Sequence, residues 1–354
     1  MAKPIRIGTR ESQLAVWQAT SVLHYLKEKG MDAELVFIKS EGDIDLSTPL
    51  YEMGVQGIFT KTLDIALLNN TIDIAVHSMK DVPTQLAQGI RQAAVLKRAS
   101  FLDVLVYRVG SRESGVWSPD AAKTYTNTDD LFSDYRLQTP DSRLQTPDSD
   151  SDSRLPTTDS RLNSDSRLTI GSSSIRRKAQ WLHRYPNHQM VNLRGNVNTR
   201  LRKVEENDWQ GAIFAAAGLE RIDLRPPTSI DLDWMLPAPA QGAIMVVCRE
   251  DDGLSFQQCQ TMNHEDTALC TSIERAFLRS LLGGCSTPIS ALAEIEQDEL
   301  YFRGNLLSPD GKQIASIEKI LPKSKAHNLG SEAAAEILEQ GGQEIITIIR
   351  NEAQ

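Results

Sequence analysis

Short apolar segments alternate with amphipathic helical segments along most of the chain, and this alternation limits the folds available to it. The apolar run at residues 5–7 leads through a polar turn into a segment whose apolar residues repeat with the period of a helix: Ala15, Ala19, Val22 and Leu26. A further helix is predicted at 61–70, and further strands at 35–38, 72–76, 103–107, 168–170, 190–193, 212–216 and 243–248. Strands that alternate with helices favour an α/β fold with mixed, mostly parallel sheets.

The character of the sequence changes at about Glu265. A helix is predicted up to Ser280, followed by two strands that flank the turn at 308–311 and by a final helix. Before this point, a second α/β block begins near Phe101, and a proline-containing connector at 236–242 precedes the strand at 243–248. We therefore expect two α/β units and a smaller α+β C-terminal domain.

A direct repeat interrupts the second α/β block. Residues 136–142 (RLQTPDS) recur at once as 143–149, and the word Asp-Ser-Arg-Leu starts at Asp141, Asp152, Asp159 and Asp165. Segments rich in Ser, Asp and Pro bury too little apolar surface to offset the entropy of ordering. The sequence therefore predicts a disordered surface insertion over about 112–167 with no catalytic role.

Charge and cysteine usage exclude several classes of protein. The 354-residue chain has 38 Lys and Arg residues against 47 Asp and Glu residues, a formal charge of −9, which argues against a general nucleic-acid or membrane-surface binder. The spacing of the four cysteines predicts neither a zinc site nor a disulfide framework, and we expect no bound metal. With no signal-like or membrane-spanning apolar run, a cytoplasmic enzyme is the default expectation.

Arginines gather at the predicted turns between strands and helices: Arg10, Arg176, Arg177, Arg194, Arg200 and Arg221. A cation in the first turn of a helix opposes the helix dipole, so such a position needs a reason. Helix N-termini already attract anions, and a guanidinium group matches a carboxylate or phosphate. The set predicts a ligand with several carboxylates or phosphates; the alternative is that each arginine is a solvated surface residue.

A cation and a carboxylate stand side by side where the predicted strand at 72–76 ends, within residues 77–83 (HSMKDVP). Lys80 could bind an anionic group while Asp81 stabilises a developing positive charge or moves protons. The alternative is a local ion pair of little energetic value. His77 is expected to be a packed histidine.

One thiol differs from the other three in its setting. Cys285 follows Gly283 and Gly284 at the predicted end of a helix, a position that leaves it accessible, whereas Cys248 ends a buried strand. The negative end of a helix dipole does not favour a thiolate, and no His/Asn partner pattern accompanies it, so a protease-like nucleophile is not indicated. An anchoring thiol remains open.

Six segments, in this order, resemble motifs of the porphobilinogen deaminase (hydroxymethylbilane synthase) family: 7–12, 75–83, 171–177, 193–200, 217–221 and 283–285. The resemblance covers the chain except about 110–167. It implies two lobes like those of periplasmic solute-binding proteins, 1–99 with 242–262 and 100–241, joined by hinges near Ala99 and Gln241. It also implies a third domain, 263–354, that carries the cofactor cysteine.

The resemblance implies a transferase that uses one dipyrromethane cofactor, made from two substrate units and held by a thioether to Cys285. Four porphobilinogen molecules are then joined head to tail, each losing ammonia, before water releases hydroxymethylbilane. This reaction belongs to tetrapyrrole (porphyrin) biosynthesis. The resemblance leaves open whether the product serves heme, chlorophyll or another tetrapyrrole.

Site residues carry over by position. Asp81 is implied as the catalytic residue, beside the pyrrole N–H groups. Cofactor contacts are implied for Cys285, Lys80, Asp81, Ser12, Ser174, Arg176, Arg177, Arg194 and Gly195. Substrate contacts are implied for Arg10, Ser12, Arg176, Arg194, Arg200, Arg221, Phe59 and Gln241. Gln56 is a departure, because many relatives have a lysine in this glycine-rich loop.

Two other functions compete with the transferase. Two hinged lobes with an arginine-lined cleft would also suit a non-enzymatic solute-binding protein, although such a module needs neither the accessible thiol nor the Lys80-Asp81 pair. A thiol hydrolase that uses Cys285 lacks a base. We expect a monomer with porphobilinogen as its partner and without nucleic-acid or membrane partners.

Overall fold

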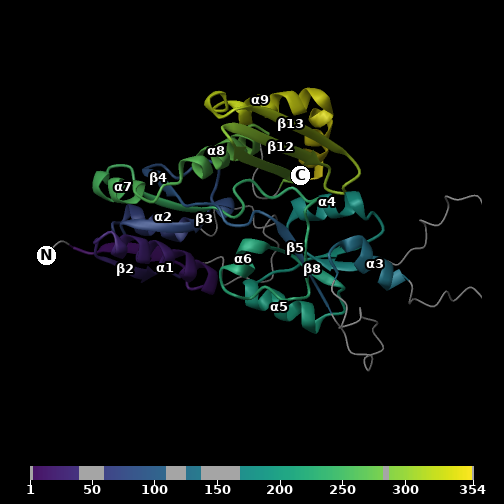
Figure 1. Ribbon diagram of the computed structural model, residues 1–354, viewed down its shortest axis with the longest axis horizontal. Coiled ribbons are helices and arrows are strands. Elements are labelled where there is room, and N and C mark those ends of the chain that lie inside the picture. Colours follow the sequence, from purple (N-terminus) through teal and green to yellow (C-terminus); the bar gives the residue numbers. More distant parts are fainter. Residues whose placement is uncertain (1–2, 40–59, 109–124, 137–167, 282–286, 353–354) are drawn as a thin grey trace, which may run out of the picture.

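Figure 1 shows two α/β lobes beside each other, with a third domain packed above them. The computed structural model describes residues 3–39, 60–108, 125–136, 168–281 and 287–352, without the side chains of 134–136 and 352. No helix in these ranges is both long and apolar enough to cross a membrane.

The first lobe is built on a five-stranded sheet in the order β2-β1-β3-β10-β4. Its strands are β1 (Ile5–Thr9), β2 (Ala33–Phe37), β3 (Ile74–Ser78), β4 (Ile90–Val95) and β10 (Ile244–Arg249), and its helices are α1 (Gln13–Glu28), α2 (Lys61–Leu68) and α7 (Gly253–Gln260). Only β10 runs against the other four strands. The apolar face predicted for α1 is confirmed, because Ala19, Val22 and Leu26 pack on the sheet.

The second lobe repeats this arrangement with different segments, in the strand order β7-β6-β8-β5-β9. Its strands are β5 (Asp103–Tyr107), β6 (Thr169–Gly171), β7 (Gln189–Val191), β8 (Gly211–Ala215) and β9 (Ser229–Asp231), and its helices are α3 (Thr128–Arg136), α4 (Ile175–Arg184), α5 (Val197–Glu206) and α6 (Ala216–Glu220). Here β5 alone opposes the other four strands. Both sheets are therefore mixed and mostly parallel, as predicted.

The chain passes between the lobes twice, and the two crossings touch. The outward crossing follows β4 and the return crossing precedes β10, and the amide of Ala99 donates to the carbonyl of Gly242 at 3.1 Å. Gly242 has φ of +84°, and a Cβ there would lie 2.6 Å from the carbonyl oxygen of Ser100. Glycine is required at this position by both its backbone conformation and the close approach of the other crossing.

The C-terminal domain is a three-stranded antiparallel sheet covered by helices. Its elements are α8 (Glu265–Ser280), β11 (Ile289–Glu296), β12 (Glu299–Leu307), β13 (Ile314–Pro322), α9 (Leu329–Ile337) and α10 (Gln343–Glu352). The carboxylate of the fully buried Glu274 on α8 forms a salt bridge with the guanidinium of Arg98 at 2.6 Å. It also accepts hydrogen bonds from the backbone amides of Ala240 and Ala293 at 2.6 and 2.8 Å. One carboxylate thus ties this domain to both crossings. The predicted fold class, two α/β lobes with an α+β C-terminal domain, is confirmed.

The predicted boundary of the disordered insertion is wrong at its N-terminal side. Residues 125–136, which fall within the predicted 112–167, include helix α3, and Tyr125, Leu131 and Phe132 are buried in the second-lobe core. Phe132 packs edge-on against Trp181 and Tyr185 of the α4 segment. Burial of these large apolar side chains offsets the entropic cost of ordering the segment, which the Ser- and Asp-rich repeats cannot do. The repeats themselves lie outside the described residues.

Candidate active site

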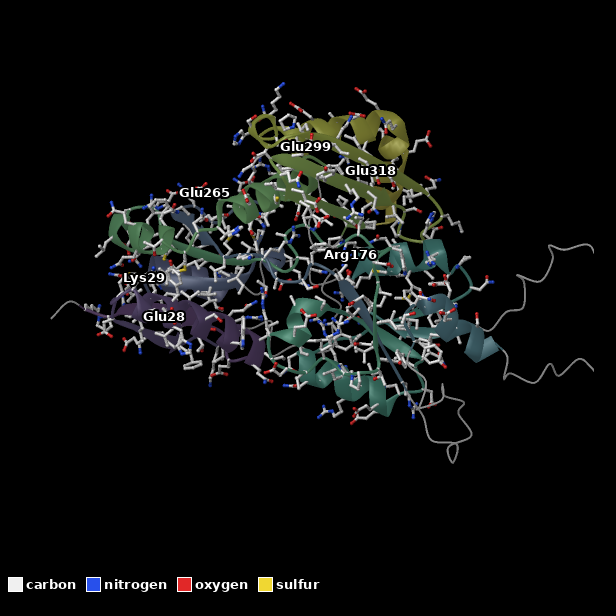
Figure 2. All side chains as sticks on the ribbon, in the orientation of Figure 1. Glu28, Lys29, Arg176, Glu265, Glu299 and Glu318 are labelled. Carbon is white, nitrogen blue, oxygen red and sulfur yellow. The ribbon has the colours of Figure 1, made fainter. Side chains whose placement is uncertain are left out.

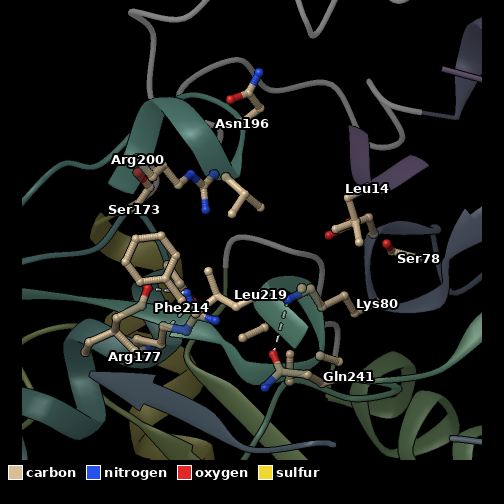
Figure 3. Close-up of a pocket in the computed structure, with 18 of the residues that line it drawn as sticks. Leu14, Ser78, Lys80, Ser173, Arg177, Asn196, Arg200, Phe214, Leu219 and Gln241 are labelled. Atoms are coloured by element: carbon tan, nitrogen blue, oxygen red, sulfur yellow. Dashed lines mark hydrogen bonds between the residues drawn. The ribbon is translucent and has the colours of Figure 1, made fainter. Parts of the chain in front are cut away.

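A cavity of about 340 Å³ lies between the lobes, at the sheet edges where the parallel strands end. Such an edge is the usual ligand site of open α/β sheets. Every predicted site residue in the described part of the chain lines this cavity: Arg10, Ser12, Lys80, Asp81, Ser174, Arg176, Arg177, Arg194, Gly195, Arg200, Arg221 and Gln241. Figure 3 shows Arg177 and Arg200 reaching into it from one side and Lys80 from the other.

The first lobe contributes the Lys80-Asp81 pair on a single 3₁₀ turn, Met79–Asp81, that directly follows β3. Met79 is buried in the lobe core, which leaves the next two side chains to line the cavity. Arg275 of α8 donates to the carbonyls of Val82 at 2.9 Å and of Pro83 at 2.5 Å. The C-terminal domain therefore holds the backbone that presents Lys80 and Asp81.

Lys80 and Asp81 have different surroundings. The Nζ atom of Lys80 donates to Oε1 of Gln241 at 3.2 Å, and burial lowers the pKa of Lys80 to about 8, although Asp81 partly opposes this. Lys80 is thus mostly protonated at neutral pH. The side chain of Asp81 faces the cavity, and no hydrogen-bond donor meets its carboxylate among the residues that the structure describes. Its oxygens can accept bonds from a ligand.

The second lobe contributes two adjacent arginines in the first turn of α4. Ser174 is the N-cap of this helix, and its Oγ accepts from the amide of Arg177 at 3.4 Å. Arg176 and Arg177 are only 4% and 6% exposed, which is rare for charged residues without a partner. Figure 2 shows Arg176 near the centre of the molecule, where the second lobe meets the C-terminal domain.

The partner of both arginines is Asp103, a residue that the sequence analysis did not single out. Its Oδ2 accepts from Nη2 of Arg176 at 2.6 Å, and its Oδ1 accepts from Nη2 of Arg177 at 2.7 Å. Burial alone would raise the pKa of Asp103, but the two guanidinium groups hold it well below its usual range. Because β5 is antiparallel to β8, this first residue of β5 lies at the cavity edge. In the sequence, the available signal for Asp103 was an acidic residue at the start of an otherwise apolar predicted strand.

Arg194 and Arg200 belong to the loop and helix that follow β7. Gly195, which follows Arg194, has φ of +111°, and a Cβ there would lie 2.7 Å from the side chain of Thr199, so the loop needs glycine. Nε of Arg200 donates to the carbonyl of Gly195 at 2.7 Å. Burial, followed by repulsion from Arg177, lowers the pKa of Arg200 to about 10, which leaves it charged at neutral pH.

Arg221 and Arg10 extend the cation set toward the first lobe. Nη2 of Arg221 donates to the carbonyl of Gly242 at 2.7 Å, and its guanidinium group lies 5.6 Å from the ring centre of Trp17 on α1. Burial lowers the pKa of Arg221 to about 10, again leaving it charged. Arg10 lies in the turn between β1 and α1, and Ser12 caps α1 by accepting from the amide of Ala15.

The cavity carries a strong excess of positive charge. Among its described lining residues are seven cations, Lys80 and the six predicted arginines, but a single acid, Asp81. The Nε–H groups of Arg176 and Arg177 are also buried, with no acceptor among the described residues. Because buried cations without partners are costly, a cavity whose described lining has seven cations and one acid is suited to an anion. Several carboxylates would balance this charge.

Two predicted site residues, Cys285 and Phe59, and the departure Gln56 lie outside the described residues. The described residues on each side of 282–286 are nevertheless close to the cavity, because Leu278 of α8 and both Thr287 and Ile289 line it.

Comparison with solved structures gives only partial overlaps. The methionine-binding protein MetQ overlaps with a TM-score of 0.38 at 12% identity, covering 73% of this chain and 89% of that one. The VFT2 domain of BvgS from Bordetella pertussis overlaps with a TM-score of 0.36 at 11% identity, covering 77% of this chain and 90% of that one.

Comparison by sequence is decisive. Residues 5–128 and 149–256 match the family model described as porphobilinogen deaminase, dipyromethane cofactor binding domain, and residues 268–339 match the model of the porphobilinogen deaminase C-terminal domain. A porphobilinogen deaminase from Pelotomaculum thermopropionicum is 37% identical over 356 residues, covering 99% of each chain. The chain belongs to the porphobilinogen deaminase family, enzymes that carry a dipyrromethane cofactor and polymerise porphobilinogen into hydroxymethylbilane in tetrapyrrole biosynthesis.

Proposed function

We propose that the cavity between the lobes is the active site for this polymerisation, with the pyrrole chain tethered to Cys285 and Asp81 as the catalytic residue. The observation that carries the proposal is the charge of the cavity, seven cations and one carboxylate among its described lining residues. A solute-binding protein and a thiol hydrolase, the two competing functions, are excluded by the family.

The residues present fit a dipyrromethane group. Each porphobilinogen unit carries an acetate and a propionate, so two units bring four carboxylates, and each added unit brings two more. Buried charge without a partner is very costly, so the cavity needs several fixed cations. Lys80, Arg176, Arg177 and Arg194, with Ser12, Ser174 and the backbone of Gly195, would hold the cofactor; its free pyrrole position supplies the carbon to which substrate is joined.

The remaining cavity residues are assigned to the incoming substrate. Arg10, Arg200 and Arg221 would bind its acetate and propionate groups, alongside Ser12, Arg176 and Arg194. Gln241 supplies an amide next to Lys80. Phe59 is proposed to pack on the pyrrole ring.

Asp81 is the one described acid that faces the ligand. When porphobilinogen loses ammonia, its pyrrole becomes an electron-poor azafulvenium cation. The Asp81 carboxylate would accept hydrogen bonds from pyrrole N–H groups and stabilise this cation as it forms, an interaction stronger in the transition state than in the substrate. Asp81 would also assist the transfer of the proton that the attacking pyrrole carbon gives up when the new carbon–carbon bond forms.

We also propose the domain boundaries 1–99 with 242–262, 100–241, and 263–354. The enzyme is proposed to act as a monomer in the cytoplasm. A thioether suits the tether because it resists the water that ends each cycle.

Intact-mass measurement tests the proposal. We expect the purified enzyme to carry an adduct of dipyrromethane size and to give an Ehrlich-positive chromophore. Cys285→Ser should lose both, while Cys270→Ala, which removes a buried thiol of α8, should keep both. An adduct that survives Cys285→Ser would disprove the tether; an unmodified, inactive wild-type chain would disprove the proposed function.

A further inference from the structure

We infer that Asp103 is a positioning residue for substrate binding: it holds the guanidinium groups of Arg176 and Arg177 at a fixed separation at the base of the cavity. This inference rests on the proposed function, because it assumes that these two arginines bind the carboxylates of the pyrrole chain. Asp103 is fully buried, and the cavity lining does not include it, so it acts on the ligand only through its partners.

The geometry of α4 makes such a partner necessary. Adjacent residues of a helix point about 100° apart, so Arg176 and Arg177 have no intrinsic reason to meet. Their like charges also repel, and burial together with Arg177 depresses the pKa of Arg176. Both nevertheless reach one carboxylate, with Arg176 on one oxygen and Arg177 on the other. The carboxylate therefore offsets the repulsion and sets the spacing of the two cations.

Two backbone carbonyls complete this arrangement. Nη1 of Arg176 donates to Leu236 at 2.5 Å, and Nη1 of Arg177 donates to Ile213 at 2.9 Å. Each guanidinium is thus held by two hydrogen bonds, which restrict its orientation. A guanidinium has five N–H donors, so each arginine retains donors for a ligand.

Asp103 also links these arginines to the first lobe. Nε2 of Gln241 donates to Oδ1 of Asp103 at 2.8 Å and to the carbonyl of Phe101 at 2.8 Å, while its Oε1 accepts from Lys80. Gln241 lies on the return crossing between lobes, and Phe101 follows the outward crossing. One carboxylate therefore orients cations from both lobes across the point where the chain passes between them.

The test compares Asp103→Asn with the wild-type holoenzyme. The amide keeps the shape of the side chain but loses the charge, and its NH₂ group faces guanidinium donors. We expect the KM for porphobilinogen to rise about 10- to 100-fold, the range for losing charge-assisted hydrogen bonds, while kcat changes less than about threefold. Asp103→Glu keeps the charge but moves it, and should raise KM in the same direction by less.

Asp73→Asn is the matched control. Asp73 makes a comparable pair with Arg6 at 2.7 Å in the first lobe, away from the cavity lining. Both Asn variants should unfold at lower temperature than the wild type, but only Asp103→Asn should raise KM. If Asp103→Asn fails to fold, Asp103→Glu provides the kinetic test.

A double-mutant cycle with Arg176→Gln separates this inference from the proposed function, which assigns Arg176 to the substrate as well as to the cofactor. If Asp103 acts through Arg176, the effects of Asp103→Asn and Arg176→Gln on KM combine to less than their product. An unchanged KM in Arg176→Gln would overturn the substrate contact that the proposed function assigns to Arg176. A raised KM in Arg176→Gln, with an unchanged KM in both Asp103 variants or fully multiplicative effects, would overturn only the role of Asp103.

Discussion

The two lobes have the same sheet topology but contribute different side chains to the cavity: the second lobe contributes mainly arginines, and the first contributes the single acid among the described lining residues. In each lobe, three parallel strands are followed by one opposed strand and then an edge strand, β2-β1-β3-β10-β4 in the first lobe and β7-β6-β8-β5-β9 in the second. The turns after β1 and β6 both end in a serine that caps the next helix, Ser12 and Ser174. The scaffold therefore does not distinguish the lobes.

The lobes differ in the segment that comes directly after the central strand. After β3, one 3₁₀ turn presents Lys80 and Asp81, whereas after β8 the short helix α6 has buried alanines and leads only to Arg221. The second lobe supplies five of the seven cavity cations and no lining acid among its described residues. We therefore propose that the second lobe supplies most of the cations that bind carboxylates, whereas the first lobe supplies the catalytic acid as well as Arg10 and Lys80.

The largest effect is expected at the acid of the first lobe. Asp81→Asn should fold normally, keep its cofactor and lower kcat by about 10²–10⁴-fold, the range for losing a residue that stabilises charge or moves protons. Steady-state kinetics and intact mass measure this. Asp208→Asn, whose side chain is 84% exposed in the second lobe, is the control and should be silent. A near-normal kcat for Asp81→Asn would show that the first lobe does not supply the catalytic acid.

The second effect concerns α3, which belongs to the second lobe. Phe132→Ala should lower the free energy of unfolding by about 3–5 kcal/mol, because it leaves a cavity among Trp181, Tyr185 and His188. Chemical denaturation measures this, with the exposed Ser133→Ala on the same helix as the control. A loss below about 1 kcal/mol would show that α3 is dispensable to the core.

The repeat after α3 should behave differently. Replacing residues 140–164 with a short Gly-Ser linker is expected to leave activity and stability nearly unchanged. A dead enzyme would show that the repeat has a role beyond that of a passive insertion. A deletion that began at residue 112 would also remove Tyr125, Leu131 and Phe132, and would destroy the second-lobe core.

A smaller effect is expected when two arginines of α5 are compared, because one lines the cavity and the other is exposed. Arg200→Gln is expected to raise the KM for porphobilinogen about 10- to 100-fold, with little change in kcat, because it removes a charge-assisted contact to carboxylate. Arg202→Gln, two residues on and 65% exposed, should change neither. Equal responses of the two variants would show that general charge, rather than the cavity, governs binding.

The sequence predicted the elements whose periodicity is strong and the site residues that sit in turns. The helix that buries Ala19 and Val22 was identified by its spacing. The arginines of the cavity were found because they gather at turns between strands and helices, and three of them, Arg176, Arg177 and Arg200, lie in the first turn of a helix, where a cation is unfavourable. Six short motifs in a fixed order then indicated the family. All of these signals are local in sequence.

The features that the sequence did not predict depend on contacts between distant segments. Strands β4 and β9 were missed. Strand β9 has only three residues, and β4 and β9 are defined by their pairing with the distant strands β10 and β5. Strand β11 is an exception: it pairs nearly locally with β12, but only two of the three strands of that domain were predicted. Asp103 was missed because its partners lie 73 and 74 residues away.

The smallest effect tests whether the first lobe also helps to grip the ligand. Burial lowers the pKa of Lys80 to about 8, and only the protonated amine binds a carboxylate strongly, so its contribution is present below pH 8 and lost above it. Loading of cofactor-free enzyme, followed by intact mass, should therefore slow by up to about tenfold from pH 7 to pH 9, since about one tenth of Lys80 is protonated one unit above its pKa. A bound carboxylate raises that pKa, which is why loading rather than turnover is measured. Lys80→Arg stays charged across this range and should remove the decline. If loading slows equally in the wild type and in Lys80→Arg, Lys80 does not bind the cofactor, and only the guanidinium groups bind its carboxylates.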